Sequence, residues 1–310
     1  MKLGFVSSIL QDETFEEVID FAAKHGFRCV EMACWPKGKA ERRYAGVTHI
    51  NVDELNDEKT EYIKKYCADR GVEISSLAYY PNTLDADPEK REVVTGHLRK
   101  VIHASARLGV GMVTTFIGRM EHANVEENLE EVKKVWPPIL EEAASLGVKV
   151  AIENCPMLFG PEQWPGGQNL FTSPANWDRI FAVLPYENLG INYDPSHFIW
   201  QMMDYIQPIY DYSEKLFHIH VKDLKVFPEK LKRVGITAYP LEYMSPKIPG
   251  LGDVDWGKYI SSLTDVGYDG YVCLEIEDKA FEKTRKDVYT SILQSKQYIE
   301  SYLKDFSDVL

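Results

Sequence analysis

Short apolar runs alternate with amphipathic segments along the whole chain. The runs are almost continuous in apolar or β-branched residues, as expected for parallel strands that are covered by helices. They predict strands over Lys2–Ile9, Cys29–Cys34, Glu73–Tyr80, Met112–Gly118, Lys149–Asn154, Leu189–Asp194, Leu216–Val221 and Tyr271–Glu275.

The segments between these runs have the spacing of amphipathic helices. Several end at a glycine placed one or two residues before the next apolar run, where a left-handed backbone conformation turns a helix back toward a sheet: Gly26, Gly71, Gly109, Gly147 and Gly267. The predicted helices are Thr14–His25, Asp53–Arg70, Pro88–Leu108, Val125–Leu146, Ala175–Leu184, Val254–Val266 and Thr284–Lys304.

This alternation predicts a (β/α)8 TIM barrel that forms a single domain over residues 1–310. A doubly wound open sheet is the structural alternative, but no GxGxxG motif follows the first strand. Two connections, 156–172 and 224–253, are longer than a barrel needs. We expect both at the carboxyl ends of the strands, as pocket walls or lids, although surface decoration would explain them too.

Composition narrows the classes of partner. The net charge of −13 argues against nucleic acid or an anionic membrane as the main partner. No apolar run approaches the ~20 residues of a membrane span. Five scattered cysteines without CxxC spacing indicate free thiols in a reducing cytoplasm. We therefore expect a cytoplasmic protein; whether it forms a homo-oligomer is left open.

Four of the predicted strands carry a metal-ligand residue near the carboxyl end: Glu153, Asp194, His220 and Glu275. A parallel barrel brings such ends together at one mouth. Three carboxylates and one imidazole favour Mn²⁺, Mg²⁺ or Co²⁺, and Zn²⁺ stays an alternative. His218 lies two residues before His220 and therefore on the same face, deeper in the barrel.

Further polar and aromatic residues follow these strands. His197 is a candidate ligand, substrate donor or acid–base group, and a helix-capping turn is its structural alternative. Lys222 could hold an oxyanion or act as a base, and an exposed charge explains it equally well. Asp223 is expected to point outward and cap a loop. A further set of residues lies near strand ends or in loops: Asn154, Trp35, Tyr79, Tyr80, Arg119, Trp164 and Trp200. The aromatic residues among them could stack on a sugar ring, and packing of a core or lid explains each equally well.

Taken together, Glu153-Asn154, Asp194-Pro-Ser-His197, His218-Ile-His220 and the final Glu275 resemble the xylose-isomerase-like barrel superfamily. Its members include sugar-phosphate isomerases and epimerases, ketose 3-epimerases, inosose dehydratases and hydroxypyruvate isomerases. The resemblance spans essentially the whole chain. It implies one Mn²⁺-like ion held by Glu153, Asp194, His220 and Glu275.

The resemblance also implies a reaction. Glu153 and Glu275 would remove and return a proton next to a metal-bound carbonyl group of a keto-sugar, inosose or related polyol. His197 and Lys222 are expected to assist catalysis and to bind the substrate. Asn154, Tyr79 and Trp164 are expected only to bind the substrate. The expected function is a metal-dependent isomerase or epimerase.

Departures from the family pattern matter. Ketose 3-epimerases resemble one another in a Glu after the fifth strand and an Arg after the histidine ligand. This chain has Phe159 and Val226 at those positions, which argues against a free ketohexose as substrate. Abasic-site endonucleases of the superfamily bind three zinc ions through further histidines and an Asp-x-His loop. This chain has Asp253-Val-Asp255 instead, so DNA repair is not expected.

Three other functions stay open. A lyase or dehydratase would expel a group β to the ketone, and His197 or Lys222 would supply the proton. A non-catalytic sugar-binding barrel would lose no turnover when Glu153 or Glu275 is changed to Gln. A metal-dependent phosphodiesterase would bind a second or third metal ion.

Overall fold

The computed structural model describes residues 1–38, 44–158 and 160–303. Eight parallel strands close into a barrel in the order β1-β10-β7-β6-β5-β4-β3-β2. These strands are β1 (Lys2–Val6), β2 (Cys29–Ala33), β3 (Glu73–Ala78), β4 (Met112–Thr115), β5 (Lys149–Glu153), β6 (Leu189–Tyr193), β7 (Leu216–Val221) and β10 (Tyr271–Leu274). The expected TIM barrel is confirmed, and the open sheet is excluded because β1 pairs with both β2 and β10.

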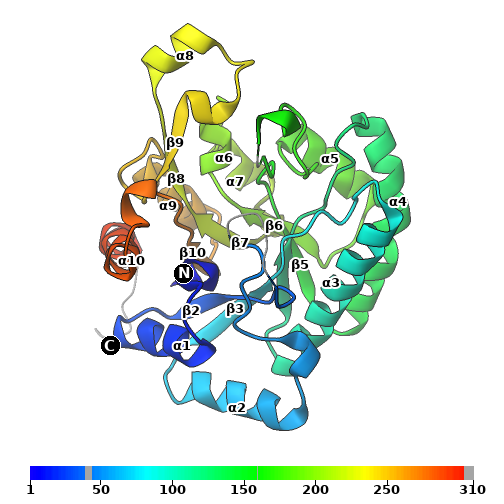
Figure 1. The fold of residues 1–310 in the computed structure, drawn as a ribbon, viewed down its shortest axis with the longest axis vertical. Helices are drawn as coiled ribbons and strands as arrows, with labels where there is room; N and C mark the ends of the chain where they lie inside the picture. The colour runs from blue at the N-terminus through cyan, green and yellow to red at the C-terminus, as the bar shows by residue number, and fades with distance from the viewer. Residues whose placement is uncertain (39–43, 159, 304–310) are drawn as a thin grey trace.

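Helices surround the barrel (Figure 1). The longer ones are α1 (Phe15–Lys24), α2 (Asp57–Ala68), α3 (Pro88–Leu108), α4 (Val125–Ser145), α5 (Pro174–Val183), α9 (Trp256–Asp265) and α10 (Arg285–Glu300). The short ones are α6 (Ser196–Ile199), α7 (Gln207–Asp211) and α8 (Pro228–Val234). Single 3-10 turns are η1 (Ser7–Leu10), η2 (Val52–Glu54), η3 (Pro161–Gln163), η4 (Ser213–Lys215), η5 (Pro240–Glu242) and η6 (Lys279–Phe281).

The glycines that end the predicted helices have the expected backbone. Their φ angles lie between +64° and +73°, in the left-handed region. In α3, the backbone N–H groups of Gly109 and Val110 donate to the Ala106 and Ser105 carbonyls and so close the last turn. These caps return each helix to the next strand, as the sequence predicts.

Several strands end earlier than the sequence predicts. The first strand stops at Val6, because residues 7–10 form the turn η1 instead. The third and fourth strands also end early, at Ala78 and Thr115. The predicted end of the last helix, Lys304, lies outside the described residues. No helix in the described ranges is both long and apolar enough to cross a membrane.

The connection 224–253 is more ordered than the expected loop. It contains an antiparallel hairpin of β8 (Asp223–Val226) and β9 (Met244–Lys247), with α8 and η5 between the two strands. Figure 1 shows this insertion, in yellow, projecting beyond the barrel. Asp223, expected to point outward, is fully buried and fixes the base of the hairpin. Its carboxylate accepts hydrogen bonds from Trp256 Nε1 and from the backbone of Leu224, Gly250, Gly252 and Val254.

The contact between β1 and β2 gives a test of the fold. A Cβ added to Gly4 would lie 2.3 Å from the Cys29 carbonyl oxygen, closer than any ordinary contact. We expect Gly4→Ala to lower the free energy of unfolding by about 1–3 kcal/mol, because the two strands must separate. Urea denaturation measures this change.

Gly96→Ala is the matched control, since Gly96 lies inside α3 and an added Cβ there would meet no described atom within 4 Å beyond the backbone of the helix itself. This change should stabilise the protein by about 0.4–1 kcal/mol, by reducing the freedom of the unfolded chain. Equal effects of the two substitutions would contradict the strand packing described here.

Candidate metal centre

Three strands bring one ligand residue each to the mouth of the barrel. Glu153 ends β5, His220 lies in β7, and Glu275 follows β10. His220 Nδ1 lies 2.9 Å from Glu275 Oε2 and 3.7 Å from Glu153 Oε1. The ligand atoms of these three buried side chains all lie within 4.8 Å of one another. The structure thus gathers three of the four residues expected to hold a metal.

Asp194 and His197 join the cluster from β6 and α6. Asp194 Oδ1 accepts a hydrogen bond from the Ser196 backbone, which fixes the turn. Asp194 Oδ2 lies 3.1 Å from His197 Nε2, and His197 Nε2 lies 3.6 Å from Glu153 Oε1. Asp194, the fourth expected ligand, is therefore linked to Glu153 through His197. The ligand atoms of Glu153, Cys155 and His197 also lie within 4.8 Å of one another.

The donor set fits a divalent cation. Five buried ligand atoms have one another as polar neighbours and make no hydrogen bond of ordinary geometry within the described part of the chain: Glu153 Oε1, Asp194 Oδ2, His197 Nε2, His220 Nδ1 and Glu275 Oε2. Buried polar atoms are normally paired, because leaving them without a partner is costly. Carboxylate oxygens and imidazole nitrogens that converge in this way are suitable ligands for Mn²⁺, Co²⁺ or Zn²⁺.

The electrostatics of the cluster also favour a positive charge. Burial would raise the pKa of Glu153, but the His197 and His220 imidazoles lower it to about 2. Burial would likewise lower the pKa of His220, yet the negative charge of Glu31 contributes to raising it well above its usual range. The ionised carboxylates are thus balanced by protons on the imidazoles, and a metal bound at His220 Nδ1 would displace the proton there.

Glu31, in β2, is a site residue that the sequence reasoning missed. Its fully buried carboxylate lies 3.0 Å from His220 Nε2, on the opposite side of the ring from the other ligands. It also accepts hydrogen bonds from Tyr80 and Ser76. A carboxylate behind a histidine ligand fixes the orientation and tautomer of the ring. The available signal was a lone acid in the apolar run Cys29–Cys34.

His218 supports the same arrangement from deeper in the barrel, as its position in the strand predicts. Its Nδ1 lies 3.0 Å from Asn192 Oδ1, and its Nε2 lies 3.1 Å from the Ser75 hydroxyl. Asn192 Nδ2 in turn lies 3.0 Å from His220 Nε2. His218 therefore contributes to the network beneath the cluster.

Lys222 lies at the mouth and faces the pocket. Its ammonium group contacts Glu275 Oε1 at 2.9 Å and Glu277 Oε2 at 3.2 Å. Burial would lower the pKa of Lys222, but the charges of Glu275 and Glu277 raise it well above its usual range. Burial would raise the pKa of Glu275, which Lys222 helps to lower to about 2. Lys222 is therefore a buried cation, which excludes the exposed-charge alternative. Glu277 was not predicted.

Asn154 joins the segments that follow β5 and β6. Its side-chain Nδ2 donates to the Asp194 carbonyl, and its Oδ1 accepts from the Asp194 backbone N–H, both at 2.8 Å. The amide is fully buried. Asn154 thus positions Asp194, and its expected contact with substrate stays a prediction.

Tyr79 and Tyr80 follow β3 and point to different surroundings. The Tyr79 ring packs edge-on against Trp35 and His97, at centroid distances of 4.9 and 4.7 Å. Tyr80 lines the pocket at the cluster and contacts Glu31. Tyr80, and not Tyr79, therefore lies beside the converging ligands, and the expected substrate contact of Tyr79 stays a prediction.

Trp164 packs under the hairpin insertion. Its indole N–H donates to the Thr237 carbonyl at 2.8 Å, and its ring lies 6.0 Å from that of Trp200. It lines a hollow next to the cluster together with Arg119 and Tyr243, but it does not line the pocket that holds Glu153 and His220. Trp164 therefore packs in the wall. Phe159, which marks a departure from the ketose 3-epimerases, lies outside the described residues.

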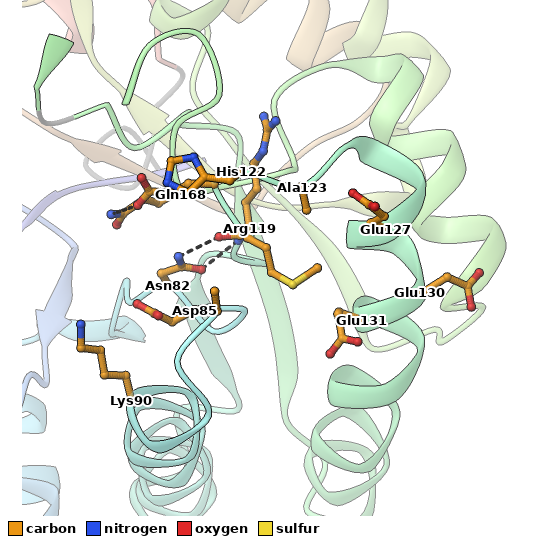
Figure 2. A pocket seen from close by; sticks show the side chains of 13 residues that line it. Asn82, Asp85, Lys90, Arg119, His122, Ala123, Glu127, Glu130, Glu131 and Gln168 are labelled. Atoms are coloured by element: carbon orange, nitrogen blue, oxygen red, sulfur yellow. Dashed lines mark hydrogen bonds between the residues drawn. The ribbon is translucent and has the colours of Figure 1, made fainter. Parts of the chain in front are cut away.

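A second hollow, more voluminous than the pocket at the cluster, is not the candidate site. A hollow of about 840 Å³ lies between the β3–α3 connection and the start of α4 (Figure 2). Asn82 closes its floor by hydrogen bonds to the backbone of Arg119, drawn as dashed lines. None of the five converging ligand atoms belongs to its lining. The chemistry of the donors, and not the volume, marks the cluster as the candidate metal centre.

The contact between Glu31 and His220 generates a prediction. Removing the charge behind a histidine ligand typically costs 10–100-fold in metal affinity. We expect Glu31→Gln to weaken Mn²⁺ binding by roughly this factor, measured by calorimetric titration. Glu73→Gln, which changes an exposed acid on the neighbouring strand, is the control and should leave the affinity unchanged. An affinity unaffected by Glu31→Gln would show that His220 Nδ1 is not a ligand.

Comparison with known proteins agrees with this geometry. The family model described as "Xylose isomerase-like TIM barrel" matches residues 19–298. An inosose dehydratase of Clostridium perfringens is 28% identical over 248 residues, which cover 77% of this chain and 80% of that protein.

Two solved structures have the same fold. The IOLI protein, solved with a bound zinc atom, superposes with a TM-score of 0.73 at 16% identity, covering 98% of this chain and all of that one. The 3-keto-D-glucoside 4-epimerase YcjR of E. coli gives a TM-score of 0.70 at 16% identity, covering 97% and 99%. The chain belongs to the xylose isomerase-like TIM barrel family.

Proposed function

We propose that this protein is a divalent-metal-dependent isomerase or epimerase of a keto-sugar, inosose or related polyol. The observation that carries the proposal is the pair of buried carboxylates, Glu153 and Glu275, on either side of His220 Nδ1. Relatives that are named as an epimerase and a dehydratase of such compounds support the substrate class.

The two carboxylates are placed to handle protons on different sides of a substrate. They come from strands that lie three places apart around the barrel, β5 and β10. Both are ionised at neutral pH, since their pKa values are lowered to about 2. One can accept a proton from a carbon next to a carbonyl group, and the other can return it. A bound divalent metal would supply Lewis-acid stabilisation of the negative charge that develops on the carbonyl oxygen.

The surrounding residues orient the pair. Lys222 holds Glu275 through its Oε1, which leaves Oε2 turned toward His220. His197 holds Glu153 from the other side of the pocket. The pocket at the cluster encloses about 100 Å³, and Phe116, Trp35 and Met157 contribute apolar walls that limit water around the reacting atoms.

Dehydration is the second candidate, and the contacts of Lys222 and His197 favour it. Both carry a proton beside a carboxylate of the pair, so either can protonate a leaving hydroxyl group. A hydroxyl lost from the carbon β to the carbonyl would turn the same proton abstraction into an elimination. The two outcomes share Glu153 and differ in what happens after the proton is removed.

Solvent deuterium exchange separates the two candidates. Protein incubated with Mn²⁺ in D2O is mixed with an inosose and with a methyl 3-keto-D-glucoside, and the products are followed by mass spectrometry and NMR. We expect deuterium at the carbon next to the carbonyl group, with the carbon skeleton and all hydroxyl groups retained. Loss of one water would establish the dehydratase instead.

The Glu153→Gln variant gives the matched test at saturating Mn²⁺. It should slow the exchange by at least about 10²-fold, the usual contribution of a positioned base. Glu61→Gln, which changes an exposed helix residue, should leave it unchanged. Exchange at equal rates in both variants, or none in the wild-type protein, would contradict the proposal.

A further inference from the structure

A second cavity adjoins the pocket at the cluster. This cavity, which we call the side chamber, encloses about 390 Å³ between the β5–α5 connection, α6 and the hairpin insertion. Cys155, Met157, Lys222 and Glu277 line both the side chamber and the pocket that contains Glu153, His220 and Glu275. The two cavities therefore adjoin at these four side chains, and a molecule bound at the cluster lies next to the side chamber.

The walls of the side chamber are mostly apolar. Met157 and Leu158 form one side, Trp200 another, and Leu224, Leu241 and Met244 of the insertion a third. Three prolines also line it, and its polar residues include Ser196, His197 and Tyr239. Such a surface offers few partners to the hydroxyl groups of a sugar, and it gains free energy by covering an apolar face.

The insertion that forms this wall is firmly attached to the barrel. Asp223 holds its base through five hydrogen bonds. Asp278 accepts bonds from Lys247 and from the Ile248 backbone at the far strand of the insertion. Trp200 and Leu224 of the lining pack with Tyr243 in a small hydrophobic cluster of their own. The side chamber is thus a built part of the fold.

The charges of the lining do not suit a phosphoryl group. The Lys222 ammonium contacts the Glu275 and Glu277 carboxylates, and Glu277 itself faces the chamber. Lys279 is exposed at the rim. His197 also lines the chamber, beside the Asp194 and Glu153 carboxylates. The buried basic side chains of the lining are thus already paired with acids, whereas a neutral ring would meet mainly apolar walls.

We infer that the substrate is a glycoside: a sugar whose reacting carbons lie at the cluster and whose second ring, with an apolar face, fills the side chamber. This inference rests on the proposed function for the place of the sugar and deepens it by naming the substrate class. Free monosaccharides would leave the chamber unfilled and would be bound less tightly.

Calorimetric titration with two simple glycosides tests the inference. Protein incubated with Mn²⁺ is titrated with phenyl β-D-glucopyranoside and with methyl β-D-glucopyranoside, which share the sugar and differ in the group placed in the chamber. We expect the phenyl compound to bind at least about tenfold more tightly, because its ring is buried against apolar side chains. Saturation-transfer NMR should show the phenyl protons in closest contact with the protein.

Two matched variants locate the effect. Leu241→Asp places a charge in the chamber wall and should remove most of the preference for the phenyl compound, while affinity for the methyl compound stays unchanged. Val234→Asp makes the same kind of change in the same insertion, outside the chamber, and should have no effect. Both residues are partly exposed, at 48% and 37%, so neither change removes a core contact.

Equal affinities for the two compounds, absence of phenyl glucoside binding, or a preference that survives Leu241→Asp would each overturn the inference. These results are independent of the exchange reaction. A phenyl preference without deuterium exchange would uphold the side chamber and contradict only the proposed reaction.

Discussion

The constraint on which this structure depends is the burial of several carboxylates in one place. Glu31, Glu153 and Asp194 are at most 3% exposed, and Glu275 is 9% exposed. Removing ionised carboxylates from water is costly unless a cation or hydrogen-bond donors compensate them. Glu31 and Asp194 are partly compensated by Tyr80 and by the backbone of Ser196. Within the described residues, the carboxylate oxygens that face the centre of the cluster are compensated only by the His197 and His220 imidazoles. These oxygens mark the position that a cation would take.

The barrel makes this concentration of charge possible. Its strand register pairs Glu153 with Asn192, Asn192 with His218, and His220 with Cys273. Inward-facing side chains of neighbouring strands therefore stack in layers, and the last layer opens at the mouth. Polar residues beneath it, among them Asn192 and Ser75, hold the histidines in place. The insertion adds an apolar wall beside this polar layer, so one opening combines two kinds of surface.

Much of this could be predicted from the sequence. The apolar runs and the glycines behind the helices indicated the order of strands along the chain, because strand and helix periodicities differ strongly. The acids and histidine at the strand ends stood out for the same reason. Glu153, Asp194, His197, His220, Lys222 and Glu275 all lie in or beside the cluster, although their roles in metal binding and catalysis await experiment.

The remaining details depend on three-dimensional contacts. Asn154 pairs with the backbone of a strand that follows 40 residues later, which no local pattern reveals. The sequence could not show that Tyr80, and not Tyr79, lines the pocket, because the exact end of a strand decides which side chain faces inward. Glu31 reaches His220 across 189 residues of sequence. The hairpin in residues 224–253 is short and rich in polar residues, so its strands carry little of the hydrophobic alternation that identifies a strand.

Metal content is the measurement that tests the central claim most directly. Elemental analysis of the purified protein after incubation with Mn²⁺ and removal of free metal should find about one divalent ion per chain, as one set of converging ligands requires. The same analysis of Glu153→Gln and His220→Ala should find most of that ion lost. No bound ion in the wild-type protein, or full occupancy in both variants, would contradict the assignment of this cluster as a metal centre.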